Sequence, residues 1–498
     1  MGAIAWLVRV LRTRVWLAPL VVMLALGLHY ITQPQVWRDE LASWTAASRS
    51  FPDLWHLLSH IDLANGAYYV VLHPVIAVFG DGALAMRAPS VLAMCVATVC
   101  VSLIGQRLFS RRAGLAAGMV FALLPSVSRF AQEARAYAFV VMFVALATLF
   151  LLWALDRPSW WRWLLYALSL SAAGIFHLVA LTCVAGHIAV IFLHRGRDDE
   201  ERRPLREYWW FPAAVLVALL PVIPLALGSL PQTSAQIGWP KPDLHNPLGS
   251  ATTMWLMLFC SGIGAGAVVV FAGLAWNNEK RSAAIGTALA LLPTAAVVVA
   301  SELGTSYYVA RYLMFTVPAW AVLAGAGVAT VSRLRGVAVA LLALALLMWP
   351  DQQAIRAPQS HDWWNYPAPN NFPSFDYLGA SKIIAAGWQP GDGVVYGERG
   401  QFPMTDLGVE YNLHGRMPLV DVLATRTAEA NGTWNPPECP SPDSCLASGP
   451  QRLWVLNTYA SDPFSFMEQP KIDALKKYYT VTRTSTVAGI TVALMVHK

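Results

Sequence analysis

The sequence predicts an α-helical polytopic membrane protein of about eleven transmembrane helices, followed by a C-terminal extracytoplasmic α/β domain. The first observation behind this prediction is composition. Of the 498 residues, 56 % are hydrophobic and only 13 % are charged, whereas soluble globular proteins have roughly 25 % charged residues. The second observation is position: arginines stand in the short loops between apolar runs, and many tryptophans flank those runs, which is typical of membrane interfaces. The net charge of +6 is therefore a topology signal. The lipid bilayer is a predicted partner, and nucleic acid is not.

The first apolar run, residues 16–31, follows a short N-terminal segment whose last arginine is Arg14. Because basic residues stay on the cytoplasmic side, the N-terminus is predicted to be cytoplasmic and residues 33–65 to lie outside. No small-x-small cleavage pattern precedes Gln33. We therefore predict an uncleaved helix rather than a signal peptide.

The later apolar runs alternate across the membrane and leave every strongly basic loop on one side. A span needs about 20 apolar residues, so the shorter run 67–79 is predicted to form an interfacial or re-entrant helix. The long run 163–194 is predicted to break into two helices near residues 174–177, with His177 at the outer end. The other predicted spans are 84–108, 113–129, 137–155, 209–227, 252–276, 283–300, 311–331 and 336–349.

Composition changes abruptly at Pro350. The change divides the chain into a predicted transmembrane domain, residues 1–350, and a domain of ordinary polarity, residues 351–498, which has the length of a small domain. Its residue pattern predicts an α/β fold. The expected elements are a helix over 375–386 and strands over 393–396, 418–423, 453–456 and within the alternating segment 479–496.

Two of the six cysteines, Cys439 and Cys445, stand in a polar, Pro-rich loop of this second domain. Such a pair outside the membrane predicts a disulfide in an oxidising compartment, with two free thiols as the alternative. The other four cysteines lie inside apolar runs, where a thiol is usually a small hydrophobic group.

Four polar motifs, each beside an apolar run, fall on the predicted outer side. The first is Trp37-Arg38-Asp39-Glu40. Two adjacent carboxylates near a membrane are costly unless they are solvated or used. The alternative is a solvated loop in which Asp39 caps a helix that begins at Glu40.

The other three motifs combine acidic, basic and aromatic side chains. They are Tyr68-Tyr69 through His73-Pro74 to Arg87-Ala88-Pro89-Ser90, then Gln132-Glu133-Ala134-Arg135-Ala136-Tyr137, and finally Tyr307-Tyr308-Val309-Ala310-Arg311-Tyr312. Each by itself is compatible with an interfacial anchor of aromatic residues and arginine. Together they place several ionisable side chains on one face of the membrane, namely Asp39, Arg87, Glu133, His177 and Arg311.

The order of these motifs resembles that of the GT-C superfamily of membrane glycosyltransferases. More narrowly, it resembles bacterial members of glycosyltransferase family 39 and the lipid A aminoarabinose transferases. The resemblance is most specific from Trp37 to Tyr137, and the C-terminal domain matches only in position and size. Such enzymes pass a sugar from a polyprenyl phosphate to an acceptor on the extracytoplasmic side. The resemblance therefore implies a multi-pass enzyme of the bacterial plasma membrane, with a polyprenyl-phosphate sugar donor and a cell-envelope acceptor as partners.

The resemblance also implies catalytic roles. Asp39 would act as general base on the acceptor hydroxyl, which requires its carboxylate to lie within about 3 Å of that hydroxyl. Glu133 would be a second acid that orients acceptor or sugar, and Glu40 is a further catalytic candidate.

The donor's leaving group is an anionic lipid phosphate, for which the two-point fork of arginine is suited. By matching motifs, Arg311 is the first candidate for the phosphate, followed by Arg87, Arg135 and His177. The predicted substrate-binding residues are Tyr68, Tyr69, His73, Tyr137, Tyr307 and Tyr312. No cofactor is certain. Some relatives bind a divalent metal near this site, and His73 near Asp39 and Glu133 is the only arrangement in the sequence that would supply one.

Two other functions remain open. A transporter or flippase for a lipid-linked substrate would place ionisable residues near the membrane midplane and show repeated halves, whereas the acids cluster here at the outer boundary and no repeat is visible. A non-catalytic scaffold that binds cell-wall material would leave the grouping of Asp39, Glu133 and Arg311 unexplained. Mannose is the first expectation for the sugar and arabinofuranose the second, by family analogy.

Overall fold

The computed structural model describes residues 14–498, except 196–207, 237–241, 244, 278, 305, 332–333, 361–373, 400–402 and 460. The basic loop after the run 163–194 thus lies outside the described residues. The chain forms two compact units. The helical unit comprises Met1–Ile31, Asp62–Val71 and Leu84–Arg356. The C-terminal unit comprises Thr32–Ile61, Leu72–Ala83 and Ala357–Lys498.

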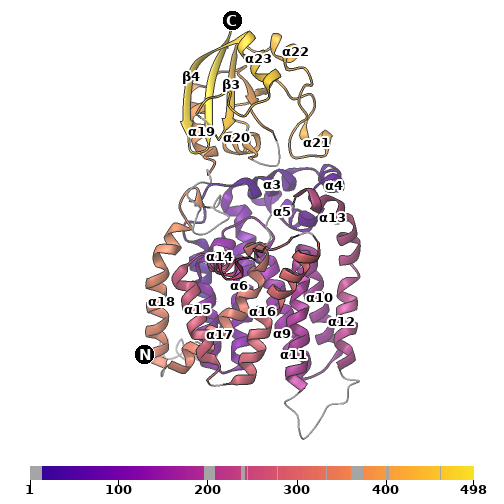
Figure 1. Ribbon diagram of the computed structural model, residues 1–498, viewed down its shortest axis with the longest axis vertical. Coiled ribbons are helices and arrows are strands. Elements are labelled where there is room, and N and C mark those ends of the chain that lie inside the picture. The colour runs from indigo at the N-terminus through magenta and orange to yellow at the C-terminus, as the bar shows by residue number, and fades with distance from the viewer. Residues whose placement is uncertain are drawn as a thin grey trace. The chain divides into compact units, whose positions relative to one another are not determined.

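The helical unit is a bundle whose longer helices run roughly along one another (Figure 1). Helix α5 (Gly66–Phe79) begins in this unit and ends in the other one. The remaining helices of the bundle are α2 (Leu17–Leu28), η1 (Leu63–Asn65), α6 (Ala83–Leu108), α7 (Arg111–Leu123), α8 (Pro125–Ala131), α9 (Tyr137–Asp156), α10 (Trp160–Phe176), η2 (Leu178–Thr182), α11 (Cys183–Arg195), α12 (Trp210–Leu219), α13 (Val222–Gln236), α14 (Pro247–Phe259), α15 (Gly262–Ala275), α16 (Lys280–Leu303), η4 (Ala310–Thr316), α17 (Val317–Val331) and α18 (Leu334–Ala354).

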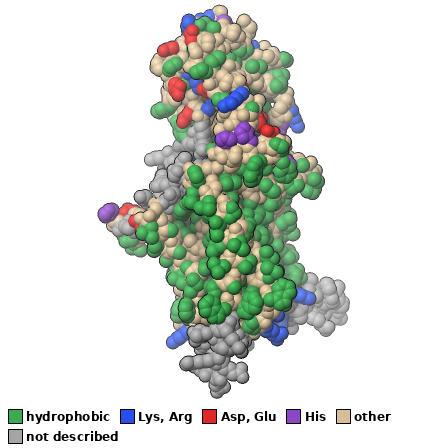
Figure 2. Space-filling model, turned by 90° about the vertical axis from the view of Figure 1, so that its right-hand side faces the viewer, with side chains coloured by type: hydrophobic (Ala, Val, Ile, Leu, Met, Phe, Trp, Pro, Cys, Tyr) green, Lys and Arg blue, Asp and Glu red, His purple; other side chains and the backbone are tan. Residues whose placement is uncertain are grey.

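Five described helical segments are long and apolar enough to cross a membrane, and three bent helix pairs would raise the number to eight. Hydrophobic side chains also cover most of the face of this unit seen in Figure 2, where Lys and Arg side chains gather at its lower end. Leu342 and Leu346 of α18, for example, are 61 % and 67 % exposed, which suits contact with lipid. The chain is a multi-pass membrane protein. The count of eleven spans stays a prediction.

The segment predicted as a span over 252–276 is bent, because it forms α14 and α15, which meet at 102°. Cys260 ends α14 with a φ of 50°, in the left-handed region. Ser261 then starts α15, since its hydroxyl accepts a hydrogen bond from the Gly264 N–H at 2.8 Å. A serine cap of this kind is a standard helix start, so the Ser-Gly sequence carried a signal for the break.

Two other predicted boundaries fall at or inside helices. The break in the run 163–194 is confirmed, because α10 ends at Phe176 and His177 has extended backbone. Helix α18, however, continues past Pro350 to Ala354, so the compositional division at residue 350 falls inside a helix. Gln352 helps to hold this last turn by donating to the Leu123 carbonyl at 2.9 Å.

Small residues allow close helix packing around α17. A Cβ on Gly325 would overlap the Ala117 backbone of α7, and one on Gly327 would overlap the Phe271 carbonyl of α15. Contacts of this kind replace the hydrophobic driving force that is missing between helices in lipid.

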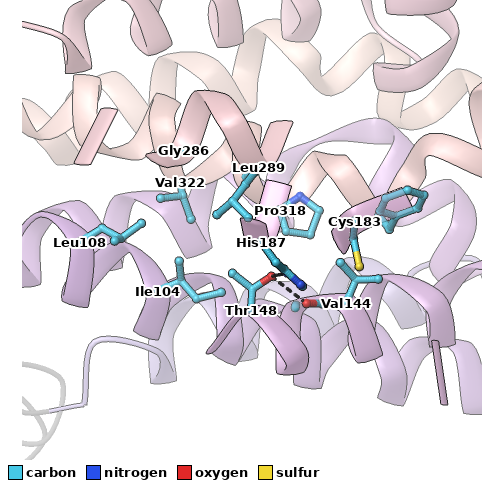
Figure 3. Close-up of a pocket in the computed structure, with 13 residues that line it drawn as sticks. Ile104, Leu108, Val144, Thr148, Cys183, His187, Gly286, Leu289, Pro318 and Val322 are labelled. Carbon is cyan, nitrogen blue, oxygen red and sulfur yellow. Dashed lines mark hydrogen bonds between the residues drawn. The ribbon is translucent and has the colours of Figure 1, made fainter. Parts of the chain in front are cut away.

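His187 is buried between the helices beside a small cavity (Figure 3). The His187 imidazole lies 3.1 Å from the Thr148 hydroxyl through Nε2 and 3.1 Å from the Tyr166 hydroxyl through Nδ1. The cavity measures only about 20 Å³, which is room for one water molecule. Because both ring nitrogens have partners, His187 is a satisfied structural histidine.

The C-terminal unit contains a five-stranded sheet in the order β2-β1-β3-β5-β4. Strands β2, β1 and β3 are parallel, whereas β5 and β4 form an antiparallel hairpin. The predicted α/β fold is confirmed, although the strand expected over 418–423 is only two residues long. The strands are β1 (Gly393–Tyr396), β2 (Val420–Asp421), β3 (Arg452–Thr458), β4 (Tyr479–Val487) and β5 (Ile490–His497), and the helices are α19 (Tyr377–Gly387), α20 (Thr405–Leu413), α21 (Ala428–Asn431), α22 (Pro442–Ala447) and α23 (Gln469–Tyr478).

The predicted disulfide between Cys439 and Cys445 is confirmed. Both cysteines pack against the hydrophobic core of the sheet, which includes Leu453 and Val455 of β3. The bridge therefore ties a short Pro-rich loop to the core.

Two N-terminal helices, α3 (Arg38–Ser48) and α4 (Phe51–His60), also belong to the C-terminal unit. The Trp44 indole of α3 meets the Tyr411 ring of α20 edge to face, with centroids 5.2 Å apart. At the end of α3, Arg49 donates to the Thr433 carbonyl at 2.7 Å. These contacts fix α3 to the same body as the sheet.

Candidate active site

The predicted site residues divide between the two units, and each group is described within its own unit. Asp39, Glu40 and His73 belong to the C-terminal unit, whereas the other predicted catalytic, phosphate-binding and aromatic residues belong to the helical unit.

Helix α3 begins at Arg38, one residue before Asp39. The fully buried Glu40 reaches back, and its Oε2 lies 3.5 Å from the Trp37 backbone N–H. A carboxylate at this position closes the first turn of a helix. Glu40 therefore serves as the cap that local reasoning had considered for Asp39.

The Asp39 carboxylate accepts a hydrogen bond from Arg38 Nε at 3.2 Å, and its side chain is 12 % exposed. It lies in the first turn of α3. A general base must be within reach of the acceptor hydroxyl, and a carboxylate that stays partly accessible meets this requirement.

His73 is held inside the C-terminal unit. Its Nδ1 lies 2.8 Å from the Ala47 carbonyl of α3, so Nδ1 carries the proton, and its ring packs on Phe51 at 4.4 Å. Among the described residues, no group of three His, Cys, Asp or Glu side chains is arranged to hold a metal ion. The metal arrangement suggested for His73 stays a prediction.

The helical unit brings together five of the residues predicted to bind the donor phosphate or the substrate. The His177 and Tyr312 rings are 4.5 Å apart, and the Tyr137 ring lies 6.2 Å from each of them. The Arg311 guanidinium lies 5.7 Å from the centre of the Tyr312 ring. Arg135 and Arg311 both act electrostatically on His177, which places Arg135 in the same neighbourhood. Arginine is suited to binding phosphate, and the phosphate-binding role of Arg311, Arg135 and His177 stays a prediction.

The His177 imidazole has spare hydrogen-bonding capacity. Its Nδ1 is buried and has no hydrogen-bond partner among the described residues. A buried polar atom of this kind costs free energy unless something satisfies it. A bound ligand with an acceptor oxygen would do so.

A chain of polar contacts links Arg135 to an acid that sequence reasoning missed. Arg135 donates to the Tyr69 hydroxyl at 3.1 Å, and Tyr69 in turn donates to Asp62. Asn65 donates to the other Asp62 oxygen at 2.8 Å. Asp62 has a φ of 60°, a conformation in which Asp is enriched. An Asp three residues before an Asn-Gly step was the only local signal.

Glu133 forms a buried ion pair with Arg129 at 2.5 Å. Its side chain is 1 % exposed, and its backbone carbonyl accepts from the Ser90 hydroxyl at 2.6 Å. Arg129 was not among the predicted site residues, although its position four residues before Glu133 is the spacing of a helical pair. The pair fixes the orientation of the Glu133 carboxylate.

Three polar side chains hold the chain where α2 ends. Gln132 Nε2 donates to the carbonyls of Gly27 at 3.0 Å and His29 at 2.7 Å, and Arg356 Nε donates to the His29 carbonyl at 2.9 Å. The fully buried Arg87 donates to the Ile31 carbonyl at 2.6 Å. Free carbonyls at a helix end need such partners. Arg87 thus has a structural contact, and its predicted phosphate role stays a prediction.

The remaining predicted aromatic residues are also placed. Tyr68 is buried and meets Phe139 edge to face, with centroids 5.8 Å apart. Tyr307 precedes η4, and its backbone N–H donates to the Ser301 hydroxyl at 3.0 Å. Its hydroxyl is close enough to Tyr312 for an electrostatic effect, so Tyr307 borders the Arg311 group.

Comparison with solved structures shows what this fold is. ArnT from Cupriavidus metallidurans bound to undecaprenyl phosphate superimposes with a TM-score of 0.57 at 16 % identity, over 98 % of this chain and 98 % of that one. The same protein in the apo state gives a TM-score of 0.57 at 15 % identity, over 99 % and 98 %. The chain has the GT-C glycosyltransferase fold.

Within this GT-C fold, residues 67–227 match the sequence profile of the family described as dolichyl-phosphate-mannose-protein mannosyltransferase. The resemblance to glycosyltransferase family 39 is thereby confirmed. The matched segment contains the Tyr69, Glu133 and His177 groups, whereas Asp39 and Arg311 lie outside it. No curated protein sequence matches the chain.

Proposed function

We propose that this GT-C protein transfers a sugar from a polyprenyl-phosphate donor to an acceptor hydroxyl on the extracytoplasmic side of the bacterial plasma membrane. The observation that carries the proposal is the grouping of Arg311, His177, Tyr137 and Tyr312 in the helical unit. A cationic and aromatic site inside a membrane protein suits a lipid-linked anion. The superimposed ArnT structure was solved with undecaprenyl phosphate, which supports a donor of this class. Mannose is the first candidate sugar and arabinofuranose the second.

Asp39 is the proposed general base. The acceptor hydroxyl gives its proton to the Asp39 carboxylate as its oxygen bonds to the anomeric carbon of the donor sugar. The bond between that carbon and the phosphate oxygen breaks, and the electron pair leaves with the polyprenyl phosphate. The products are the glycosylated acceptor, the lipid phosphate and a protonated Asp39, which later returns its proton to water. Glu133, held by Arg129, orients the acceptor or the sugar.

Arg311 is the proposed phosphate ligand. Its guanidinium neutralises the charge that builds on the leaving phosphate, because a planar fork makes two hydrogen bonds to one phosphate. The buried His177 Nδ1 is free to take part in a hydrogen bond to a phosphate oxygen when it carries the proton. Such interactions, stronger in the transition state than in the ground state, accelerate the transfer.

A donor panel tests the proposal. Purified protein is incubated with polyprenyl-phosphate mannose, polyprenyl-phosphate arabinofuranose and a mixed glycan acceptor, and sugar transfer is followed by mass spectrometry. The panel is run with and without a metal chelator, which also tests the metal arrangement suggested for His73. We expect transfer from one donor and release of the free lipid phosphate. Protein that binds a donor but transfers no sugar from any of them would point to a transporter or a scaffold instead.

Two carboxyl variants provide the controls in that assay. Asp39→Asn keeps the shape and removes the basicity, so transfer should fall by about 10²–10⁴-fold while donor binding persists. Glu40→Gln keeps an oxygen that can accept from the Trp37 N–H and should retain most of the activity. The opposite pattern would assign the base to Glu40.

A further inference from the structure

A cavity of about 580 Å³ opens at one end of the sheet in the C-terminal unit. It lies where the parallel strands β1 and β2 end. Tyr396 at the end of β1, Arg399 beyond it and Asp421 at the end of β2 line it. Helix α20 adds Glu410. In open α/β sheets, ligands bind outside the carboxyl ends of the strands. The volume is also that of a small-molecule site.

On one side of the cavity, ion pairs hold the acidic and basic side chains in place and balance their charges. The Arg399 side chain is only 6 % exposed and forms ion pairs with Asp406 at 3.3 Å, with Glu438 at 2.6 Å and with Asp421. Lys471 pairs with Glu438 at 2.7 Å from the other side. These ion pairs orient the carboxylates that Arg399 holds. Their oxygen atoms therefore offer hydrogen-bond acceptors in defined directions.

The carboxylates of Glu410 and Glu429 also line the cavity. Neither Glu410 nor Glu429 makes a side-chain hydrogen bond or ion pair with any described residue. The lining has four carboxylates against two guanidinium groups, so it disfavours a phosphate or another anion. Trp434 adds an apolar surface. A wall of oriented acceptors beside an aromatic residue suits a ligand that is rich in hydroxyl groups.

The cavity shares an element with the proposed base. Thr45 of α3 lines it, and Asp39 stands six residues earlier on the same helix, which is about 9 Å along the axis. Asp81 links α3 to α20. Trp44 Nε1 of α3 donates to the Asp81 carboxylate at 2.9 Å, and the Tyr411 hydroxyl of α20 donates to the Asp81 carbonyl at 3.3 Å. The cavity wall and the helix that carries Asp39 therefore form one body.

We infer that this cavity is an acceptor subsite that binds a neutral sugar residue of a glycan acceptor and so presents a neighbouring sugar's hydroxyl to Asp39. The inference rests on the proposed transferase function and names its acceptor class. The sugar hydroxyls donate to Glu410, Glu429 and the carboxylates held by Arg399. The acceptor is then a glycan of more than one sugar, because the bound residue and the reacting residue are different.

Acceptor length tests the inference. The probes are octyl glycosides that carry one to four mannose or arabinofuranose units, used with the full-length protein. The wild type should show a KM that falls as the glycoside grows from one unit to two or more. The double variant Glu410→Gln/Glu429→Gln should raise the KM for the long glycosides by about tenfold or more, since two charge-assisted hydrogen bonds weaken. The KM for the donor should not change. The matched control is Glu398→Gln/Glu468→Gln, which makes the same change of charge on exposed carboxyls outside the cavity.

Binding without donor separates this inference from the proposed function. Calorimetric titration of the four-unit glycosides should give weaker affinity for the cavity variant than for the control variant, whether or not any donor is turned over. An enzyme that transfers sugar but shows the same KM for all acceptor lengths, or a cavity variant that binds like the control, would overturn the subsite and leave the transferase proposal standing. Glycan binding by a protein that transfers no sugar would overturn the transferase proposal while locating the glycan site.

Discussion

An arginine that binds a phosphate differs from one that anchors a helix at the membrane surface in how it uses its guanidinium. An anchor needs a positive charge and a long stem, and lysine supplies both. A phosphate ligand uses two N–H groups in one plane, which lysine lacks. Arg311 lies over the Tyr312 ring, and its charge acts on the buried His177. We propose the second role for it.

The first residue-scale prediction follows from this difference. Arg311→Lys should fold normally and weaken donor binding by about 1–3 kcal/mol, the range for charge-assisted hydrogen bonds. Affinity for a polyprenyl-phosphate sugar, measured in detergent, provides the test. Arg107→Lys is the matched control, because Arg107 makes a partly exposed ion pair with Asp156, which contributes little. If the wild type, Arg311→Lys and Arg107→Lys bind the donor equally well, Arg311 is an interfacial anchor and not a phosphate ligand.

Glu410 gives a prediction about pH. Its pKa is raised, chiefly by desolvation and further by the negative charges of Asp406 and Glu429. Since the folded state holds this proton more tightly than the unfolded state, ionisation of Glu410 costs stability as pH rises above its unfolded pKa of about 4.3. Glu410→Gln should therefore raise the melting temperature at pH 7 by on the order of 1–2 °C and leave it unchanged near pH 3. Thermal unfolding of the wild type and of Glu410→Gln, followed by tryptophan fluorescence at the two pH values, gives both melting temperatures. A lower melting temperature of Glu410→Gln at pH 7 would contradict the prediction.

At the scale of elements, the end of α2 depends on side chains from distant helices. Its last carbonyls accept hydrogen bonds from Gln132 and Arg356, because no further turn of helix supplies N–H groups. The chain then leads through the buried Arg87 contact at Ile31 toward α3. The polar motif around Gln132 therefore helps to fix the path of the backbone.

The corresponding prediction concerns Gln132. Gln132→Ala leaves a buried carbonyl without its partner and should cost about 1–3 kcal/mol of stability, seen as a lower melting temperature in detergent. Gln132→Glu, which keeps the shape and loses the donors, should cost at least as much. Gln106→Ala removes a glutamine of α6 for which the structure gives no side-chain hydrogen bond among the described residues, and it should melt like the wild type. If all the variants have the same melting temperature as the wild type, the hydrogen bonds from Gln132 to the end of α2 do not contribute to stability.

At the scale of the whole molecule, the membrane topology determines which residues are accessible from outside the cell. The basic-loop pattern predicts that Ser48 is extracytoplasmic and Ser110 cytoplasmic. Both positions are exposed, so cysteines placed there are accessible from their own side. The four free cysteines are buried, which keeps the background low.

Labelling intact cells with a membrane-impermeant thiol reagent measures this topology. Ser48→Cys should react in intact cells, and Ser110→Cys should react only after the membrane is opened. Either residue behaving in the opposite way would invert or break the predicted topology, and with it the extracytoplasmic position of Asp39.

The sequence by itself determined the features that depend on local composition and spacing. The apolar runs, the break at His177, the short helix α5, the α/β character of the C-terminal domain and the pairing of Cys439 with Cys445 were all predicted, because hydrophobicity and turn residues act over a few neighbouring positions. The order of polar motifs also led to the GT-C fold.

Only the tertiary structure decided which polar groups meet. Tyr69 and Arg135 are 66 residues apart, and Arg356 reaches the end of α2 from 327 residues away, so no local pattern pairs them. Glu40 rather than Asp39 caps the start of α3. The cavity beside β1 and β2 gathers carboxylates from α20, from the end of β2 and from α21. The physical reason is common to all of them. A side chain's partner depends on the path of the whole backbone, and the sequence states only what each residue can bind.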